Sequence, residues 1–342
     1  MNKYIFSVLS VLITFSMPLS SHACTRIFYN INIAKFVTRS MDYFESDIPL
    51  LLVMPRGIER ESHTDNKPLK WKSKYGSVVV TAYHTDAVSD GMNENGLAVH
   101  SLYLHQADYP ARDAKLSTLS SALWAQYLLD NFKTVKEVVD ASHQFQIVPI
   151  KIHGNLSAQK LVLEDASGDS AIIEFVNHQI NILHGKKWQV ATDAIDDATE
   201  DNRLNQYISF GGKLSLPGDV TASDRFVRAA TYLKTLPTPN NLIEASGYGL
   251  SAIKTVMIPF GAINYSSQQA AWPTRWIMGA DLTNKTYYFD STTEPNIVWI
   301  DFKKLNFNEG ADILALDPTD ETLNGESSGG LHKKHATDLI PS

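Results

Sequence analysis

The chain has 342 residues, a formal net charge of −7 and a single cysteine. Its content of 44% hydrophobic and 20% charged residues is typical of a globular protein rather than a disordered one. An acidic chain without a cluster of Lys and Arg is a poor partner for nucleic acid. One cysteine also excludes an internal disulfide, so the hydrophobic core must supply the stability.

The first 23 residues predict a secretory signal peptide. Lys3 provides a positive start, residues 4–17 are mostly apolar, and the small residues Ser21 and Ala23 precede the expected cleavage site. The apolar run is shorter than the roughly 20 residues that cross a bilayer. We therefore assign residues 1–23 to a signal peptide and expect a periplasmic or secreted protein that is not attached to the membrane.

Short β-patterned runs dominate the next part of the chain. We expect strands within residues 24–31, 34–43, 76–83 and 97–104, with a hairpin turn at Asn93 to Gly96 ahead of the last one. A helical section follows, capped by Ser117 or Ser120 and carrying apolar residues at Leu119, Leu123, Tyr127 and Leu128. Residues 134–142 continue it.

Strands return in the second half, followed by a further helix. Residues 160–175 predict one hairpin, and residues 179–193 predict a second pair of strands joined by a "HGKK" turn. Thr221 and Asp224 form a capping pattern ahead of an amphipathic helix that reaches residue 236. Residues 275–291 and 296–302 read as strands, and residues 319–342 as a flexible polar tail.

This order of blocks predicts an α+β layered architecture with largely antiparallel sheets. Regular βαβ alternation and glycine-rich phosphate loops are absent from the sequence. No change in composition divides the chain, so we expect one domain over residues 24–318.

Cleavage after Ala23 would make Cys24 the first residue, which gives the lone cysteine a chemical meaning. Its thiol is a good nucleophile, and its free α-amine, titrating near 8, can accept the thiol proton. Two alternatives remain open. Cys24 could carry a lipid anchor, although Ser21 and His22 replace the Leu and small residue of the usual recognition box, or the thiol could be incidental.

Five segments resemble the choloylglycine hydrolase family of N-terminal nucleophile hydrolases, which includes bile salt hydrolases and penicillin V acylases. They are "CTRIFYN", "VTRSMDY", "DGMNENGLAVHSL", "LPGDVTASDRFVRAA" and "TNKTYYFDS", in the family's order. The resemblance covers nearly the whole chain after residue 23. It implies an αββα four-layer sandwich with largely antiparallel sheets, the N-terminal nucleophile hydrolase fold.

The resemblance also implies a set of catalytic residues. Cys24 would be the nucleophile, Asp42 would hold the amine or thiol, and Arg39 would supply positive charge that favours the thiolate. Arg225 matches the family's second catalytic arginine. Without the family, Arg39 and Asp42 read as an exposed ion pair on a strand, and Arg225 as a structural residue near Asp224. Arg228 reads as a solvated helix residue.

Two further positions are less conventional. Tyr103 falls where some penicillin V acylases carry a tyrosine that helps to form the oxyanion site, although it also reads as a core tyrosine on a strand. Asp193 stands where the family usually has Asn, and Ile195 where it has Pro. An Asn amide can donate to an oxyanion, whereas an ionised Asp cannot. Asp193 could instead bind the N-terminal ammonium, be protonated, or lower the activity.

We therefore predict an exported cysteine amidohydrolase that cleaves a linear amide through Cys24. Penicillin V and acyl-homoserine lactones are the preferred small-molecule substrates, because the connector before "LPGD" is short and Tyr43, Trp71 or Tyr103 could line an acyl pocket. A conjugated bile salt hydrolase is the alternative, and a lipid-anchored or catalytically weakened binding protein is the alternative from another class. No metal or organic cofactor is implied, and a homo-oligomer is left open.

Overall fold

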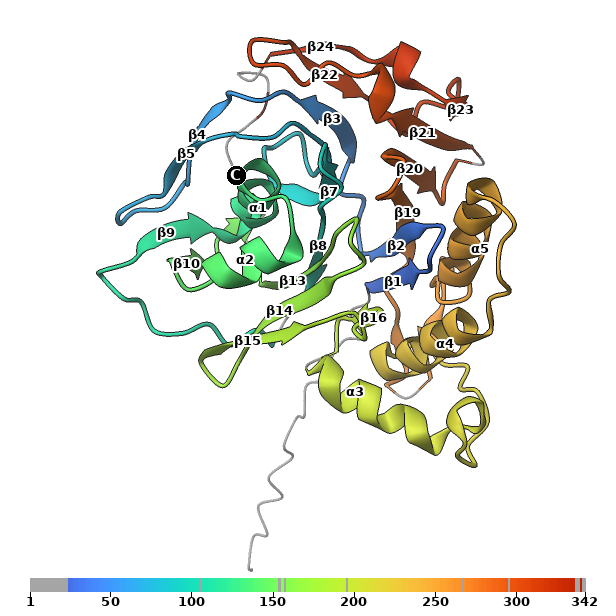
Figure 1. Cartoon of the computed structure of the whole chain (residues 1–342). Helices are drawn as coiled ribbons and strands as arrows, with labels where there is room; N and C mark the ends of the chain where they lie inside the picture. The colour runs from blue at the N-terminus through green and yellow to red at the C-terminus, as the bar shows by residue number, and fades with distance from the viewer. Residues whose placement is uncertain are drawn as a thin grey trace, which may run out of the picture.

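Two antiparallel sheets stacked face to face form the centre of the protein. The computed structural model describes residues 24–104, 106–152, 155–156, 158–194, 196–265, 267–294, 296–335 and 339. Helices cover the outer face of each sheet, α1 and α2 on one side and α4 and α5 on the other (Figure 1). The predicted αββα sandwich is therefore confirmed.

The smaller sheet has seven strands among the described residues and begins next to Cys24. Its strands run in the order β16-β1-β2-β19-β20-β21-β23, and all neighbours are antiparallel except β21 and β23. The bounds are β16 Val190–Thr192, β1 Thr25–Asn30, β2 Lys35–Asp42, β19 Thr274–Asp281, β20 Thr286–Ser291, β21 Ile297–Asp301 and β23 Gly325–Glu326.

The larger sheet has nine strands among the described residues, in the order β15-β14-β13-β8-β7-β6-β3-β22-β24. The bounds are β15 Gln179–His184, β14 Ser170–Val176, β13 Gln159–Glu164, β8 Ala98–Tyr103, β7 Val88–Asn93, β6 Ser77–Thr81, β3 Leu50–Met54, β22 Ile313–Leu316 and β24 His332–Lys334. Gly96 adopts a φ of +85° in the predicted turn between β7 and β8, a conformation that favours glycine.

Shorter elements complete the structure. The two-stranded pairs are β4 Glu59–Glu61 with β5 Lys70–Lys72, β9 Ser117–Ser120 with β10 Phe145–Val148, β11 Lys151–Ile152 with β12 Asn155–Leu156, and β17 Ile263–Asn264 with β18 Gln269–Ala270. The α-helices are α1 Trp124–Asn131, α2 Val135–Ala141, α3 Asp197–Arg203, α4 Ala222–Thr235 and α5 Leu242–Lys254.

Alternating side chains of the two sheets form the central core between them. Buried residues such as Phe28 and Val37 from one sheet meet Val78, Val80 and their neighbours from the other. A second cluster lies under α1 and α2, and a third under α4 and α5. On α5, Gly249 lets the helix approach β2, because a Cβ at this position would lie 2.4 Å from the ring of Phe36.

The helix after the short connector starts as the sequence predicts. The Thr221 hydroxyl accepts a hydrogen bond from the backbone N–H of Asp224 and caps the N-terminus of α4. The buried face of α4 carries Phe226, Val227 and Ala229. Arg225 lies on the same buried side, so this cap also fixes where a charged side chain enters the protein interior.

One local prediction is confirmed only in part, and two are wrong. Residues 117–120 form a strand, so Ser120 and not Ser117 caps the short 3-10 turn Ser121–Leu123 that leads into α1. The strands within 179–193 do not pair with each other, because β15 belongs to the larger sheet and β16 to the smaller one. Within the expected tail of residues 319–342, β23 pairs with β21 and β24 pairs with β22, since both sheets offer a free edge there. The predicted signal peptide, residues 1–23, lies outside the described residues.

Candidate active site

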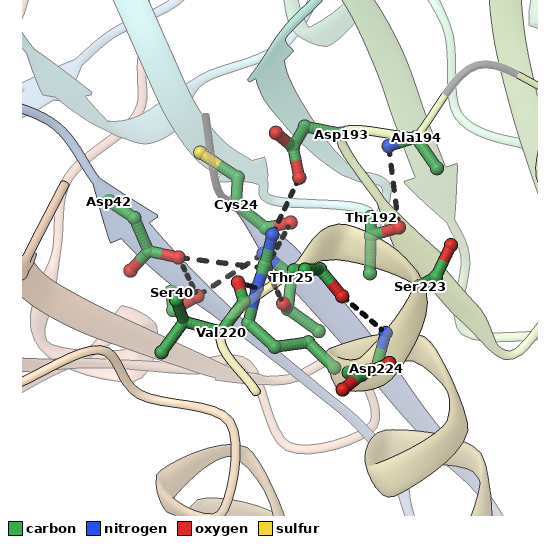
Figure 2. Close-up of polar contacts among 12 residues, drawn as sticks. Cys24, Thr25, Ser40, Asp42, Thr192, Asp193, Ala194, Val220, Ser223 and Asp224 are labelled. Carbon is green, nitrogen blue, oxygen red and sulfur yellow. Dashed lines mark hydrogen bonds and ion pairs between the residues drawn. The ribbon is translucent and has the colours of Figure 1, made fainter. Parts of the chain in front are cut away.

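Cys24 immediately precedes β1 and is almost completely buried, with 2% of its surface exposed. The register of β1 and β2 pairs Thr25 with Ser40 and Arg26 with Arg39, which places the end of β2 beside the cysteine. On the other side, Thr25 pairs with Thr192 of β16, the residue before Asp193. Three strands of one sheet therefore bring Cys24, Asp42 and Asp193 together (Figure 2).

Arg39 is the cation nearest to the thiol. Its Nη2 lies 3.4 Å from the Cys24 Sγ and donates to the carbonyl of Ser101 at 2.7 Å. The guanidinium also lies 4.8 Å from the centre of the Trp276 ring. Arg39 and Asp42 are both buried, so the alternative that they form an exposed ion pair is wrong.

Arg225 holds the backbone at Cys24 from the other side. Its Nη1 donates to the carbonyl of Cys24 at 3.1 Å and to the hydroxyl of Thr25 at 2.5 Å. Its Nη2 donates to the Asp193 carboxylate at 2.7 Å, and Asp42 lies 3.8 Å from Nη1. Arg225 is fully buried and connects both carboxylates to the first residues of β1, which goes beyond a structural pairing with Asp224.

Burial makes the Cys24 thiol and the Asp42 carboxyl group hard to ionise. Desolvation raises the pKa of the Cys24 thiol, while Arg39 lowers it and Asp42 raises it further. Burial also raises the pKa of Asp42 to about 7, against the opposing effect of Arg225 and of hydrogen bonds donated by Thr274 and Ser40. The thiol therefore needs a base, and the positive charge of Arg39 alone does not supply one.

Asp193 is a buried carboxylate with an exposed fraction of 8%. Burial raises its pKa, and Arg225 lowers it. Among the described residues that line the cavity beside the Cys24 thiol, Asp193 and Arg225 are both missing. The Asp193 carboxylate contacts Arg225, which also donates to the carbonyl of Cys24, so it lies on the backbone side of Cys24. Ile195, the second departure from the family pattern, lies outside the described residues.

The cavity beside Cys24 encloses about 110 Å³ and is mainly apolar. Its wall includes Cys24, Arg39, Asp42, Tyr43 and Tyr103. Two other cavities, of about 210 and 340 Å³, lie away from Cys24, so size alone does not identify the site.

Tyr43, Tyr83 and Tyr103 line this cavity, and two more aromatic rings, Phe44 and Trp272, pack against Tyr43. Tyr43 packs against Phe44, Tyr103 and Trp272 with ring centroids 4.5, 6.3 and 5.0 Å away. Tyr103 is half-buried and lines the cavity, so it is not a core tyrosine. Trp71 is elsewhere, donating to Asp130 and packing against Tyr127.

Trp272 was not predicted as a residue near the site. No local pattern marks it, because only the folded chain brings it beside Tyr43.

Arg228 corrects another prediction. It is half-buried, and its guanidinium donates to the carbonyls of Thr255, Pro217 and Asp219. It therefore fastens the connector to α4 instead of lying in solvent. Within the described part of the chain, no group of three His, Cys, Asp or Glu side chains is arranged to hold a metal ion. None of the helices described there has the length and apolar content required to cross a bilayer.

Comparisons with known proteins agree with this geometry. The family model described as "Linear amide C-N hydrolases, choloylglycine hydrolase family" matches residues 24–316. A penicillin V acylase from Pectobacterium atrosepticum is 36% identical, with 96% of each chain covered. A bile salt hydrolase/transferase from Clostridium perfringens is 26% identical over 56% of this chain and 66% of its own length.

Solved structures show the same fold. The penicillin V acylase from Agrobacterium tumefaciens superposes with a TM-score of 0.83 at 35% identity, covering 93% of this chain and 100% of its own. A mutant of the conjugated bile acid hydrolase from Clostridium perfringens gives a TM-score of 0.72 at 20% identity, covering 92% of this chain and 99% of its own, which shows the shared fold alone.

The stacked sheets, with a cysteine at the head of the first strand, define an N-terminal nucleophile hydrolase fold. The match over residues 24–316 then identifies the chain as a member of the choloylglycine hydrolase family. It is a hydrolase that acts on carbon–nitrogen bonds in linear amides.

Proposed function

We propose that the chain is an exported cysteine amidohydrolase in which Cys24 is the nucleophile, acting on an amide with an aromatic or fatty acyl group. One observation carries this proposal. The Cys24 thiol lies in the wall of a mainly apolar cavity that Tyr43, Tyr83 and Tyr103 also line, while Arg225 and two carboxylates surround its backbone.

The α-amine of Cys24, freed when residues 1–23 are removed, is the base in this proposal. Because burial raises the pKa of the thiol, the thiol needs a proton acceptor close by. The amine takes that proton as the sulfur attacks the amide carbonyl, and it then gives the proton to the departing nitrogen. Water hydrolyses the resulting thioester, releasing the acid and restoring the thiol.

Asp42 and Asp193 would hold the amine. Both approach Arg225, which itself fixes the carbonyl of Cys24, so the backbone at residue 24 has little freedom. The pairing of the Asp193 carboxylate with Arg225 favours this role over donation to the oxyanion, because an ionised carboxylate has no proton to donate. Arg39 would moderate the charge on the sulfur, and Tyr103 would contact the acyl group or the oxyanion.

Penicillin V is the substrate that we place first, with acyl-homoserine lactones beside it. The cluster of Tyr43, Phe44, Tyr103 and Trp272 suits the phenoxyacetyl group of penicillin V or an acyl chain. The two relatives named as penicillin V acylases, 36% and 35% identical to this chain, support that order. Conjugated bile salts are the second candidate, supported by the bile salt hydrolase/transferase at 26% identity.

Export to the periplasm or the medium belongs to the same proposal. It is supported by the apolar segment before Ser21 and Ala23, and by the need for a free α-amine at Cys24. The intact mass of the protein recovered from a periplasmic fraction tests it. We expect a mass that begins at Cys24 and carries no acyl group. Another first residue, or an attached fatty chain, would remove the proposed base.

Activity tests the nucleophile. Wild type and Cys24→Ser should be compared on penicillin V, an acyl-homoserine lactone and glycocholate. We expect wild type to turn over penicillin V fastest and Cys24→Ser to lose at least about 1,000-fold in kcat, since the hydroxyl is far less acidic than the thiol. Equal turnover by the two proteins would refute the proposed role of Cys24.

A further inference from the structure

The segment that carries Asp193 is held by a lysine from the opposite sheet. Lys160 lies on β13 of the larger sheet and is fully buried. Its Nζ donates to the carbonyl of Ala194 at 2.8 Å and to Asp197 Oδ2 at 2.5 Å. Asp197 Oδ1 in turn accepts from the backbone N–H of Thr192 at 3.2 Å.

These contacts enclose Asp193 on both sides. The N–H before it, at Thr192, and the carbonyl after it, at Ala194, both belong to one network that ends on Lys160. Figure 2 shows the backbone N–H of Ala194 directed at the Thr192 hydroxyl, 3.4 Å away, so the turn is also braced locally. The side chain of Asp193 is left to contact Arg225.

Stability alone is a weak reason for this arrangement. A buried ion pair costs desolvation energy that its attraction roughly repays, and apolar residues of similar volume often serve equally well. Glu174, the other carboxylate near the Lys160 Nζ at 3.7 Å, belongs to β14 of the same sheet as Lys160. Among the described residues its carboxylate contacts Lys160 and Asn181, not residues 192–194. Lys160 itself and Asp197 are therefore the two parts of the network that contact residues 192–194.

We propose that Lys160, acting through Ala194 and Asp197, is a positioning residue that sets the place of Asp193 beside the N-terminus of the mature chain. The inference rests on the proposed function, in which Asp193 holds the α-amine of Cys24. Lys160 does not touch the substrate. It fixes the backbone on both sides of the carboxylate, so that the side chain reaches Arg225 and the amine together.

The test compares a variant that removes the lysine at the centre of the network with a variant that removes only one of its two carboxylate partners. Lys160→Met removes the ammonium while filling its space, and Glu174→Gln removes the carboxylate that does not contact residues 192–194. With penicillin V we expect Lys160→Met to lower kcat at least about tenfold, because a small displacement of a catalytic group is costly, and to leave KM within about twofold. Glu174→Gln should keep both constants within about twofold of wild type.

A double variant protects the test against loss of folding. If Lys160→Met is insoluble, Lys160→Met with Asp197→Leu replaces the ion pair by apolar residues, and we expect a folded protein with the same loss of kcat. A folded Lys160→Met protein, or a folded double variant, with kcat within about twofold of wild type would overturn the proposal. An equal loss in Lys160→Met and Glu174→Gln would overturn it as well, because it would point to core packing alone.

Failure of this inference is separable from failure of the proposed function. The function is refuted by a fully active Cys24→Ser protein, whichever result Lys160→Met gives. The inference alone is refuted if the Lys160→Met protein is fully active while the separate Cys24→Ser protein is inactive.

Discussion

The two sides of Cys24 are built in different ways. On the backbone side, buried charges meet, with Arg225 between Asp42 and Asp193. Asp42 ends strand β2, Arg225 lies in the first turn of α4, and Asp193 follows strand β16. On the thiol side, tyrosines line a cavity, and Phe44, which packs against Tyr43, is 45% exposed. Substitutions on the backbone side should therefore lower the stability of the fold. Residues on the thiol side can vary without that loss and so select the acyl group.

The largest effect is expected on the charged side. Arg225→Met should leave Asp42 and Asp193 buried without their cation, which costs about 3–5 kcal/mol in the free energy of unfolding. It should also lower kcat by at least about 1,000-fold, because the carbonyl of Cys24 loses its donor. Urea unfolding and penicillin V hydrolysis measure the two losses.

Arg228→Met is the matched control for Arg225→Met. Arg228 lies on the same helix and, in the contacts described, donates to three backbone carbonyls, so we expect a loss of about 2–4 kcal/mol in the free energy of unfolding and little loss of activity. Equal losses of activity in both variants would remove the distinction between the charged side and an ordinary helix anchor.

The pH dependence of stability sharpens the same contrast. The pKa of Asp42 is raised from 3.8 to about 7, so between these values the folded protein binds a proton that the unfolded chain releases. Stability from this group is therefore present below pH 4 and declines as the pH rises to 7, by ~4 kcal/mol at most. Asp42→Asn should remove this part of the decline.

Urea unfolding at pH 5, 6 and 7 checks the prediction for Asp42. Asp47, whose pKa is raised to about 6 by burial, adds a decline of the same sign that Asp42→Asn leaves in place. Wild type and Asp42→Asn should therefore diverge most between pH 5 and pH 7. Parallel curves over this range would mean that Asp42 ionises in the folded protein as it does in the unfolded chain.

Substitutions on the aromatic side should mainly change the KM for the substrate. Tyr103→Ala should raise KM for penicillin V about tenfold, since the ring contacts Tyr43 and Trp272 at the cavity. Tyr103→Phe keeps the ring and should stay within about threefold of wild type in kcat and KM. A loss of kcat in Tyr103→Phe as large as that in Tyr103→Ala would instead assign the hydroxyl to the oxyanion site.

The charged side was largely predictable from the sequence, and the aromatic side was not. The resemblance to the family marked Cys24, Arg39, Asp42 and Arg225. From the strand pattern alone, Arg39 and Asp42 read as an exposed ion pair, whereas both are buried. Trp272 and Phe44 carry no such pattern. They meet because the loop after β2 lies beside the residues before β19, a contact across the sheet that local propensity does not encode.

The same reason explains the errors in the fold. The strands within residues 179–193 were recognised, but a run of alternating residues does not say which sheet each strand joins. The polar residues 325–334 have no strand pattern of their own, and they become strands because β21 and β22 offer edges to pair with. Lys160 was missed as well, since a lone lysine in a strand reads as exposed until the opposite sheet covers it.

The smallest effect is expected where two loops meet at the mouth of the cavity. The Tyr83 hydroxyl donates to Glu45 at 3.2 Å, and Tyr83 and His84 adopt left-handed φ values of 56° and 57°. Tyr83→Phe removes the partly exposed hydrogen bond to Glu45, a bond worth about 0.5–1.5 kcal/mol, while the ring and the backbone stay in place. KM for penicillin V should therefore rise by less than about threefold, with kcat unchanged. A larger fall in kcat would show that this loop contact acts on the charged side of Cys24, and the two sides could then no longer be treated as separate.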